Sequence, residues 1–308
     1  MKRILITPRS LTSSPAQAVD MLSRHGYEVV SSTPGKIPDE SELLELVPNV
    51  VGWLAGVEPI SAKVIDAAAN LKVISRNGSG VDNLPTKTVA ERGIIVRRAE
   101  GSNAQGVAEL AIALMFASLR HIPFADAGIK AGIWQRKKGI EVRGRTVGIV
   151  GCGAIGREVA RLAAGLGAQI LAFDPARPDL GIDINLYRWV DLPILIAEAD
   201  IVTFHCPPTR NGLPLIGMAE LNSMKFGSIM INTARASLID ESAVVQALNL
   251  GQLSTYATDV FPQEPPSSLD LYGRSDVIAT SHIGGFTDES VDRATTIAVN
   301  NLIESLHG

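Results

Sequence analysis

TVGIVGCGAIG, at residues 146–156, is the part of this sequence that decides its fold. The apolar run before Gly151 is typical of a buried strand, and good helix formers follow from Ala154 onward. Between them the glycines match the GxGxxG pattern of a dinucleotide-binding loop, in which they allow a tight turn, a close approach of pyrophosphate and close helix packing. The amino terminus of the following helix would face the phosphates. We therefore predict a cofactor loop made of Gly151, Gly153, Ala154, Ile155 and Gly156.

The strand expected at 169–173 ends at Asp174, which follows Gly156 at about the spacing of 20 residues typical of a ribose-binding acid. Its carboxylate can accept hydrogen bonds from both ribose hydroxyls and would repel a 2′-phosphate, so we expect NAD in preference to NADP. Arg177 is close enough in sequence to offer such a phosphate a positive charge. An aspartate before Pro175 is also common in turns. A glycine-rich turn in an unrelated α/β protein is the general alternative, and the strand and helix around the loop disfavour it.

Short apolar runs alternate with helical patterns on both sides of this loop. In the first hundred residues, strands are expected at 4–7, 27–30, 50–56, 71–75 and 94–98, with helices at 16–26, 61–70 and 86–93. These helices should end near Gly26, Asn70 and Gly93, where a left-handed cap costs little. After the glycine loop, further strands are expected at 200–205, 227–233, 254–260 and 277–282. Such alternation predicts parallel sheets.

The length of 308 residues suits two α/β domains with a cleft between them. Residues 102–120 should form one long helix that links the domains, and the helical pattern at 288–306 could return to the first domain. The fold class expected is therefore α/β, with two Rossmann-like doubly wound parallel-sheet domains. Residues 1–100 plus 286–308 would form a flavodoxin-like substrate domain, and residues 101–285 an NAD-binding Rossmann domain.

Composition excludes several classes of function. The net charge of −4 offers no broad positive field for nucleic acid or an anionic membrane. Two cysteines, Cys152 and Cys206, cannot form a disulfide framework, and no signal peptide or spanning segment is apparent, so we expect a cytoplasmic protein. The apolar run 107–119 fits a buried helix or the surface of a homodimer. No cluster of residues has the spacing of a metal site.

Three polar segments follow apolar strands of the second domain, at the sheet edge where ligands bind in α/β proteins. They are NTAR at 232–235, DVFPQEP at 259–265 and SHIGG at 281–285. Reduction of a 2-oxo acid requires a cation for the carboxylate and a proton donor for the carbonyl oxygen. An arginine is a forked and permanently charged donor, and a histidine titrates near neutral pH. Each residue alone is more often structural.

The glycine loop, NTAR, DVFPQEP and HIGG, in this order, resemble the D-isomer specific 2-hydroxyacid dehydrogenase family across nearly the whole chain. The chain is most similar to phosphoglycerate dehydrogenases without a regulatory domain. The resemblance implies that Arg235 binds the substrate, that His282 is the acid/base and that Glu264 supports it. It also implies an NAD-dependent oxidoreductase that moves a hydride between NAD(H) and a small 2-hydroxy or 2-oxo acid.

The expected cofactor contacts lie in the glycine loop and after the strands of the second domain. They are Gly151, Gly153, Ala154, Ile155, Gly156, Asp174, His205, Cys206, Pro207, Thr233, Ala234, Asp259 and Gly284. Of these, His205 is expected to act through its backbone, Cys206 looks like a small apolar filler, and Asp259 could instead be a turn cap. In the first domain, a glycine-rich loop after the strand 71–75 is expected to hold the substrate carboxylate. Its residues are Asn77, Gly78, Ser79 and Gly80.

The substrate itself stays open. Glu58 would oppose a phosphate, whereas Arg9, Lys63 or Arg76 could favour one, so 3-phosphoglycerate is only one possibility. The alternatives are hydroxypyruvate or glyoxylate reductase activity, and a non-catalytic NAD-sensing interaction protein of the same fold. Formate dehydrogenases of the family are disfavoured by Glu264, because glutamine is usual there. Ala236 after Arg235 departs from the usual glycine without removing a catalytic group.

Overall fold

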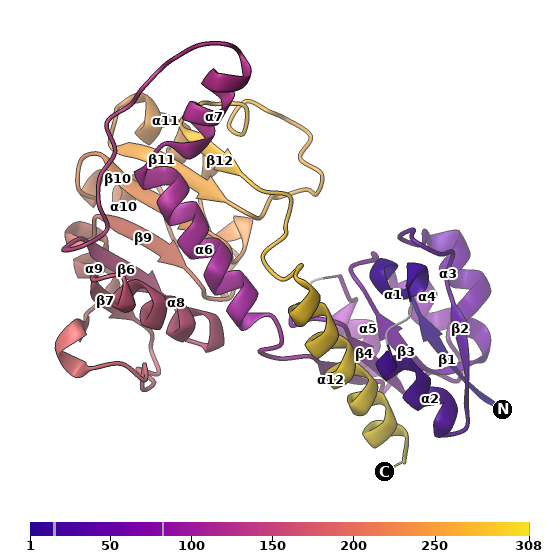
Figure 1. Ribbon diagram of the computed structural model, residues 1–308. Helices are drawn as coiled ribbons and strands as arrows, with labels where there is room; N and C mark the ends of the chain where they lie inside the picture. Colours follow the sequence, from indigo (N-terminus) through magenta and orange to yellow (C-terminus); the bar gives the residue numbers. More distant parts are fainter. Residues whose placement is uncertain (15–16, 82, 308) are drawn as a thin grey trace. The chain divides into compact units, whose positions relative to one another are not determined.

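The computed structural model describes residues 1–14, 17–81 and 83–307. It divides into two compact units (Figure 1). Unit 1 comprises Met1–Asn103 and Gly285–Gly308, and unit 2 comprises Ala104–Gly284. Each unit is built around its own parallel sheet, which confirms the α/β class with two parallel-sheet domains.

Unit 1 contains a five-stranded sheet in the order β2-β1-β3-β4-β5, in which every neighbouring pair is parallel. The strands are β1 (Lys2–Ile6), β2 (Tyr27–Ser31), β3 (Val50–Ala55), β4 (Val73–Arg76) and β5 (Ile95–Arg98). This is the flavodoxin-like strand order, whose switch point lies between β1 and β3. All five strands overlap the runs expected from the sequence.

Helices cover both faces of this sheet because successive strand residues point to opposite sides. Leu5 packs with residues of α3 (Glu40–Leu46), α4 (Ala62–Ala67) and α5 (Thr86–Glu91). Its neighbours Ile4 and Ile6 pack with α1 (Arg9–Ser13), α2 (Asp20–Arg24) and α12 (Asp288–His307). The last helix of the chain thus completes the core of unit 1.

Helix ends in unit 1 follow the predicted glycines but not Asn70. Gly26 and Gly93 are left-handed, with φ of 83° and 64°. Asn70 is not among the residues with positive φ, and α4 already ends at Ala67. The prediction for Asn70 was wrong because buried Ala68 and Leu71 form a turn, closed by the Leu71 N–H to Ala68 carbonyl bond. In the helix predicted at 16–26, Ala16 lies outside the described residues, and the described part is a 3-10 turn (Gln17–Val19) followed by α2.

Unit 2 contains a seven-stranded parallel sheet in the order β12-β11-β10-β9-β6-β7-β8. The strands are β6 (Thr146–Val150), β7 (Gln169–Phe173), β8 (Tyr187–Trp189), β9 (Ile201–Phe204), β10 (Ser228–Asn232), β11 (Leu253–Thr258) and β12 (Val277–Ala279). The sequence pattern did not reveal β8, which has only three residues and lies at the sheet edge. The order reverses at β6, which lies between β7 and β9.

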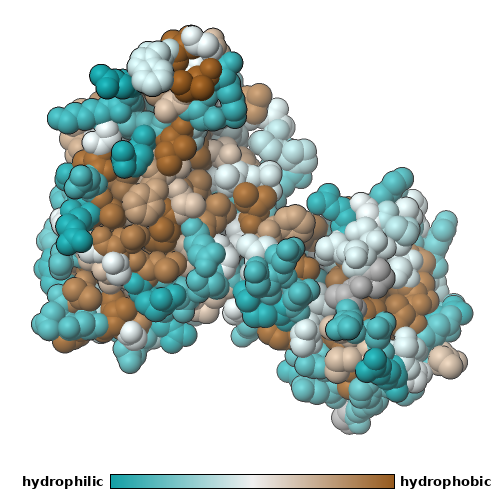
Figure 2. All heavy atoms as spheres, in the orientation of Figure 1, coloured by the Kyte–Doolittle hydropathy of each residue, from teal (hydrophilic) through white to brown (hydrophobic). Residues whose placement is uncertain are grey.

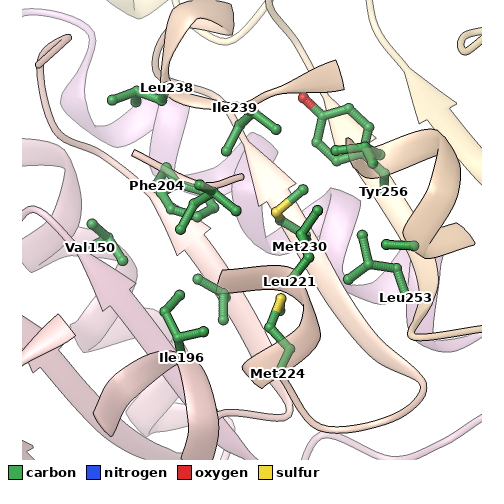
Figure 3. Packing of buried hydrophobic residues seen from close by; sticks show 14 of the residues in the cluster. Val150, Ile196, Phe204, Leu221, Met224, Met230, Leu238, Ile239, Leu253 and Tyr256 are labelled. Carbon is green, nitrogen blue, oxygen red and sulfur yellow. The ribbon is translucent and has the colours of Figure 1, made fainter. Parts of the chain in front are cut away.

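Alternation along β10 shows how the two faces of this sheet are filled. Met230 belongs to a core shared with α9 (Leu192–Glu198), α10 (Met218–Ser223) and α11 (Glu241–Asn249), part of which Figure 3 shows. Ile229 and Ile231 belong to a second core with α6 (Ala104–Leu119) and α8 (Ala154–Gly165). Figure 1 shows α6 lying across this second face. The sheet edge that carries the predicted site is therefore fixed from both sides.

After α6, α7 (Ile122–Lys130) continues the chain at a bend of 66°. Among the described residues, no single helix combines the length and apolar character needed to cross a membrane, although α6 and α7 together reach that length and composition.

Candidate active site and cofactor site

The glycine loop lies at the switch point of the seven-stranded sheet, directly after β6. Val150, the last residue of β6, pairs with Phe173 of β7 on one side and with Phe204 of β9 on the other. Gly151 donates its N–H to the carbonyl of Phe173 at 2.8 Å, and His205 donates its N–H to the carbonyl of Val150 at 2.8 Å. In open parallel sheets, ligands bind beyond the carboxyl ends of the strands at such a point.

The surroundings of Gly151, Gly153 and Gly156 explain why glycine stands at each position. Gly151 has φ of 90°, and a Cβ there would lie 2.7 Å from the Cβ of Cys206. A Cβ on Gly156 would lie 2.0 Å from the carbonyl oxygen of Gly151. A Cβ on Gly153 would meet no atom within 4 Å, so this glycine leaves open space above the backbone. These are the turn, packing and approach roles expected of a dinucleotide loop.

The amino terminus of α8 is available to an anion. Gly153 is its N-cap and makes no side-chain capping hydrogen bond, so no side chain of this residue covers the first N–H groups. The helix begins at Ala154, as predicted, and runs for 12 residues. Uncapped N–H groups and the helix dipole together favour a phosphate. The residues present therefore fit the pyrophosphate of a dinucleotide.

Asp174 follows β7 and is half-buried beside the loop. Its Oδ2 accepts the N–H of Cys152 at 2.8 Å, and its Oδ1 accepts the N–H of Ala176 at 2.8 Å. A carboxylate can accept about four hydrogen bonds, so both oxygens retain capacity for ribose hydroxyls. Arg177 extends toward Asp191, with an N···O distance of 3.7 Å. The aspartate thus acts as a turn residue and also faces the glycine loop.

His205 and Cys206 follow β9 and pack against the loop. The Nε2 atom of His205 lies 2.9 Å from the hydroxyl of Thr203, and burial lowers the pKa of His205 to about 3. This imidazole therefore stays neutral at physiological pH. Burial and, to a lesser extent, the Asp174 carboxylate raise the pKa of the Cys206 thiol to about 11 and that of the Cys152 thiol to about 12. Pro207 is exposed after them.

Two buried polar atoms at this edge have no hydrogen-bond partner in the described part of the chain. They are Nδ1 of His205 and Oγ1 of Thr233. The two residues directly follow Phe204 and Asn232, which are paired in the register of β9 and β10. Burying a polar group without a partner is costly, so these two atoms are available to a ligand that binds at this edge. Their position beside the glycine loop fits the dinucleotide.

Asn232, at the end of β10, fixes the loop that carries Arg235. Its side chain accepts the N–H of Ala234 at 3.0 Å and donates to the carbonyl of Arg235 at 2.8 Å. Its own carbonyl accepts the N–H of Asp259 at 3.0 Å, which joins this loop to the one after β11. Arg235 is half-buried, and its Nη1 donates to the carbonyl of Ala234 at 2.7 Å.

Asp259 is only 2% exposed and holds the loop that carries His282. Its Oδ1 accepts the hydroxyl of Thr280 at 2.6 Å and the N–H of Ile283 at 2.9 Å. Its Oδ2 accepts the N–H of Gly284 at 2.8 Å. These contacts match the turn cap that the sequence left open as an alternative. The carboxylate thus holds the Thr280 side chain before the left-handed His282, whose φ is 54°, and the backbone directly after it.

Glu264 and His282 form a direct pair. The Nδ1 atom of the imidazole lies 2.7 Å from Oε2 and 2.9 Å from Oε1 of the carboxylate. Both side chains are open to solvent on their other side, being 50% and 40% exposed for His282 and Glu264. The pair lies after β11 and β12, while Arg235 follows β10, the strand next to β11. All three residues thus follow adjacent strands at one sheet edge.

An aromatic contact supports the loop that carries Glu264. The rings of Phe261 and Tyr272 meet edge to face, with centroids 4.8 Å apart. The Tyr272 hydroxyl donates to the carboxylate of Glu241 in the first turn of α11. Burial and this hydrogen bond raise the pKa of Tyr272 above its ordinary value. Phe261 also donates its N–H to Oε1 of Glu264 at 3.3 Å.

The predicted substrate loop belongs to unit 1, where it follows β4. Arg76 at the end of this strand donates to the carbonyls of Gly80 at 2.9 Å and Ala55 at 3.0 Å, which joins the loops after β4 and β3. Asn77 donates its N–H to Ala55. The four residues Asn77, Gly78, Ser79 and Gly80 are each partly exposed.

Sequence reasoning missed three residues that shape the site. Asn232 stands in NTAR, and a polar residue directly after the apolar run Ile229–Ile231 is a usable signal for it. Thr258, whose hydroxyl donates to the carbonyl of Val260 at 2.9 Å, gives a weaker signal, because β11 already contains Ser254 and Thr255. Tyr272 gives none, because its contact with Phe261 spans a loop of unpatterned sequence. In the described part of the chain, no group of three or more histidine, cysteine or acidic side chains could hold a metal ion.

Comparison with known proteins bears on this geometry. Residues 112–284, nearly all of unit 2, match the model of the D-isomer specific 2-hydroxyacid dehydrogenase NAD-binding domain. A D-3-phosphoglycerate dehydrogenase of Archaeoglobus fulgidus is 37% identical over 95% of this chain and 56% of its own length. A hydroxypyruvate reductase of Thermotoga maritima is 37% identical over 87% of this chain and 89% of its own.

Among solved structures, the NAD+-bound 3-phosphoglycerate dehydrogenase of Entamoeba histolytica has a TM-score of 0.83 and 26% identity, covering 100% of this chain and 96% of its own. The chain spans about half the length of the Archaeoglobus fulgidus dehydrogenase and most of the length of the Thermotoga maritima reductase. The family model, the sequence relatives and the loop that fits a pyrophosphate all indicate an NAD-binding domain. This chain belongs to the D-isomer specific 2-hydroxyacid dehydrogenase family and carries its NAD-binding domain.

Proposed function

We propose that this protein is an NAD-dependent D-2-hydroxyacid dehydrogenase that interconverts a small 2-hydroxy acid and its 2-oxo acid. The observation that carries the proposal is the two-oxygen contact of Glu264 with Nδ1 of His282. Because Nδ1 faces the carboxylate, Nε2 is the ring nitrogen left to exchange a proton with substrate. A half-exposed imidazole held in this way suits an acid/base better than a structural side chain.

Each of the three residues has a distinct role in this proposal. NAD(H), when bound, supplies or accepts the hydride. During reduction, Nε2 of protonated His282 gives its proton to the carbonyl oxygen, and during oxidation it removes the proton from the hydroxyl. Glu264 stabilises the imidazolium and fixes the ring. Arg235 holds the substrate carboxylate and polarises the carbonyl through its forked donors.

Unit 2 is the NAD-binding domain, and we assign substrate binding in part to unit 1. The support is the loop after β4: within the described residues, the N–H groups of Gly78, Ser79 and Gly80 donate to no protein acceptor. Successive backbone donors of this kind can hold a carboxylate. In this assignment residues 1–100 plus 286–308 form the substrate domain and residues 101–285 the NAD-binding domain.

For the cofactor, we infer that the glycine loop and α8 hold the pyrophosphate and that Asp174 binds the adenosine ribose. The unpartnered Nδ1 of His205 and Oγ1 of Thr233 would then bind polar groups near the nicotinamide. Cys206 fills space under Gly151, with Pro207 beyond it. Ala234 and Gly284 would let the cofactor come close to the backbone. Asp259 acts by holding the His282 loop.

We also propose a cytoplasmic homodimer with no nucleic-acid or membrane partner. The outward face of α6 carries small and apolar residues, including Ala113, Phe116 and Ala117, and the following helix exposes Ile122 and Ile129 by 52% and 60%. Figure 2 shows hydrophobic side chains gathered over and beside α6. A second copy of the chain would remove this surface from water.

The test is a spectrophotometric assay of purified protein with NADH and a panel of 2-oxo acids, including glyoxylate, hydroxypyruvate and hydroxypyruvate 3-phosphate. We expect consumption of NADH with at least one acid and formation of the D isomer. If NADH binds but none of the acids is reduced, the protein is a non-catalytic NAD-binding member of the family and the proposal is wrong.

A further inference from the structure

The five-stranded sheet of unit 1 has its own switch point. The strand order reverses at β1, which lies between β2 and β3. The loop after β1 begins at Thr7, and the loop after β3 begins at Gly56. Sheets of this order bind ligands beyond the carboxyl ends of these two strands.

A buried carboxylate, that of Glu58, lies at this switch point. Its Oε1 accepts the N–H of Gly56 at 2.9 Å and the hydroxyl of Thr7. The Thr7 oxygen in turn accepts the indole N–H of Trp53 at 2.9 Å. Glu58 is 1% exposed and Thr7 is equally buried. One carboxylate therefore bridges the loops after β1 and β3.

The surrounding backbone is built around this side chain. A Cβ on Gly56 would lie 2.7 Å from Oε2 of Glu58 and 2.9 Å from the Cα of Pro8, so only glycine fits there. The side-chain amide of Asn83 donates to the carbonyl of Glu58 at 2.6 Å and fixes the same loop. Burial raises the pKa of Glu58, while the Thr7 and Gly56 hydrogen bonds and the charge of Arg76 act against that rise.

This arrangement bears on which substrates unit 1 can accept. The Gly56 N–H at the switch point is a donor that an external anion could use, and it is already bound by the chain's own carboxylate. The loop after β4, to which we assign the substrate carboxylate, is joined to Ala55, next to Gly56, through Arg76. For an acid that is held by this loop with its tail directed toward the switch point, a phosphate on the tail would lie beside Glu58, where like charges are poorly screened.

Building on the proposed dehydrogenase activity, we propose that Glu58 is a specificity-determining residue that selects 2-oxo acids with an uncharged tail and rejects those with a phosphorylated one. The effect requires the ionised carboxylate, which the Thr7 and Gly56 donors and the nearby Arg76 charge favour against the effect of burial. It acts through charge because the side chain is buried among the chain's own atoms. We expect wild type to prefer hydroxypyruvate over hydroxypyruvate 3-phosphate by about tenfold or more in kcat/KM.

The test compares wild type, Glu58→Gln, Glu58→Asp and the control Glu91→Gln with both acids and NADH. Glu91 is an exposed acid of the same unit, on α5. We expect Glu58→Gln to reduce the preference by about tenfold, mainly by lowering KM for the phosphorylated acid. Glu58→Asp, which keeps the charge, and Glu91→Gln should retain the preference. Circular dichroism checks that each variant is folded.

Calorimetric binding of glycerate and 3-phosphoglycerate to the wild type and the Glu58 variants gives a readout that does not depend on turnover. Wild type should bind glycerate more tightly, and Glu58→Gln should close the gap. A wild-type preference for the phosphorylated compound, or a preference unchanged in Glu58→Gln, overturns the role of Glu58 and leaves the dehydrogenase proposal intact. If neither oxo acid is reduced, the dehydrogenase proposal fails, and the binding comparison still decides the role of Glu58.

Discussion

The imidazole of His282 and the carboxylate of Glu264 face each other across two loops, with Nδ1 2.7 Å from Oε2 and 2.9 Å from Oε1. Both residues lie in loops, and other residues hold each loop in place. Asp259 fixes the backbone after His282, and Phe261 donates its N–H to Glu264 at 3.3 Å. The chain's own contacts therefore hold the pair in place, and the parts of the site can be tested one at a time.

Replacing His282 with alanine removes the proposed acid/base while leaving the glycine loop intact. We expect kcat to fall by about 10²- to 10⁴-fold, the range that general acid/base catalysis contributes. The dissociation constant for NADH, measured by fluorescence, should be nearly unchanged. His25→Ala, at the exposed end of α2 in unit 1, is the matched control. Equal loss of turnover and NADH binding would mean that His282 has a structural role.

Replacing Asp174 with alanine should weaken the discrimination between NAD and NADP, because the carboxylate that repels a 2′-phosphate is gone. The variant also loses the acceptor for the N–H groups of Cys152 and Ala176. We therefore expect a loss of about 1–2 kcal/mol in the free energy of unfolding. The measurements are kcat/KM for both cofactors and a urea denaturation curve. An unchanged cofactor preference would refute the ribose assignment.

Asp259→Asn tests whether this carboxylate holds the His282 loop. An amide NH2 would replace one of two oxygens that now accept three hydrogen bonds, and a donor would then oppose an N–H or a hydroxyl. Because the side chain is 2% exposed, we expect a loss of about 2–3 kcal/mol in unfolding free energy, together with reduced kcat. Unchanged stability would show that the loop keeps its shape without Asp259.

Asp200 gives the protein a pH-dependent contribution to stability. Burial pushes its pKa upward, but the N–H of Thr146 and the charges of Lys225 and Arg145 outweigh this and hold the pKa below its ordinary value of 3.8. A lowered pKa means that the contribution is complete above the unfolded-state value and is lost as the pH falls through the folded-state value.

The pH dependence can be measured against Asp200→Asn. Wild type should be more stable by about 1 kcal/mol at pH 7, with the difference shrinking at pH values below about 4. The partly exposed Lys225 ammonium at 2.9 Å accounts for only part of this value. Denaturation curves across this range decide the matter, and a difference that grew as the pH fell would contradict the assignment.

Local sequence signals predict most of the fold. The glycine loop specifies its turn because Gly151 has a φ of 90° and because a Cβ on Gly156 would lie 2.0 Å from the Gly151 oxygen. Apolar runs predict the long strands, since each strand in a doubly wound sheet is buried on both faces. The pattern of α12 likewise predicts a helix, and its apolar positions complete the core of unit 1.

What the sequence does not predict depends on contacts between distant residues. The early end of α4 results from burial of Ala68 and Leu71, and propensity alone would continue that helix to Asn70. Asp259 stands in a recognisable motif, yet its three acceptor contacts with Thr280, Ile283 and Gly284 depend on the pairing of β11 with β12. Glu58 can be suspected from its charge, but only the arrangement of β1 and β3 brings it to the switch point.

The most direct test of the central claim is a crystal structure of the protein with NADH and the unreactive substrate analogue oxamate. We expect Nε2 of His282 within about 2.6–3.2 Å of the oxygen that corresponds to the reacting carbonyl, with Nδ1 still facing Glu264. Arg235 should contact the carboxylate of the analogue. An imidazole that faces away from a fully bound analogue, or an Arg235 that contacts neither oxygen group, would contradict the assignment of these residues to catalysis.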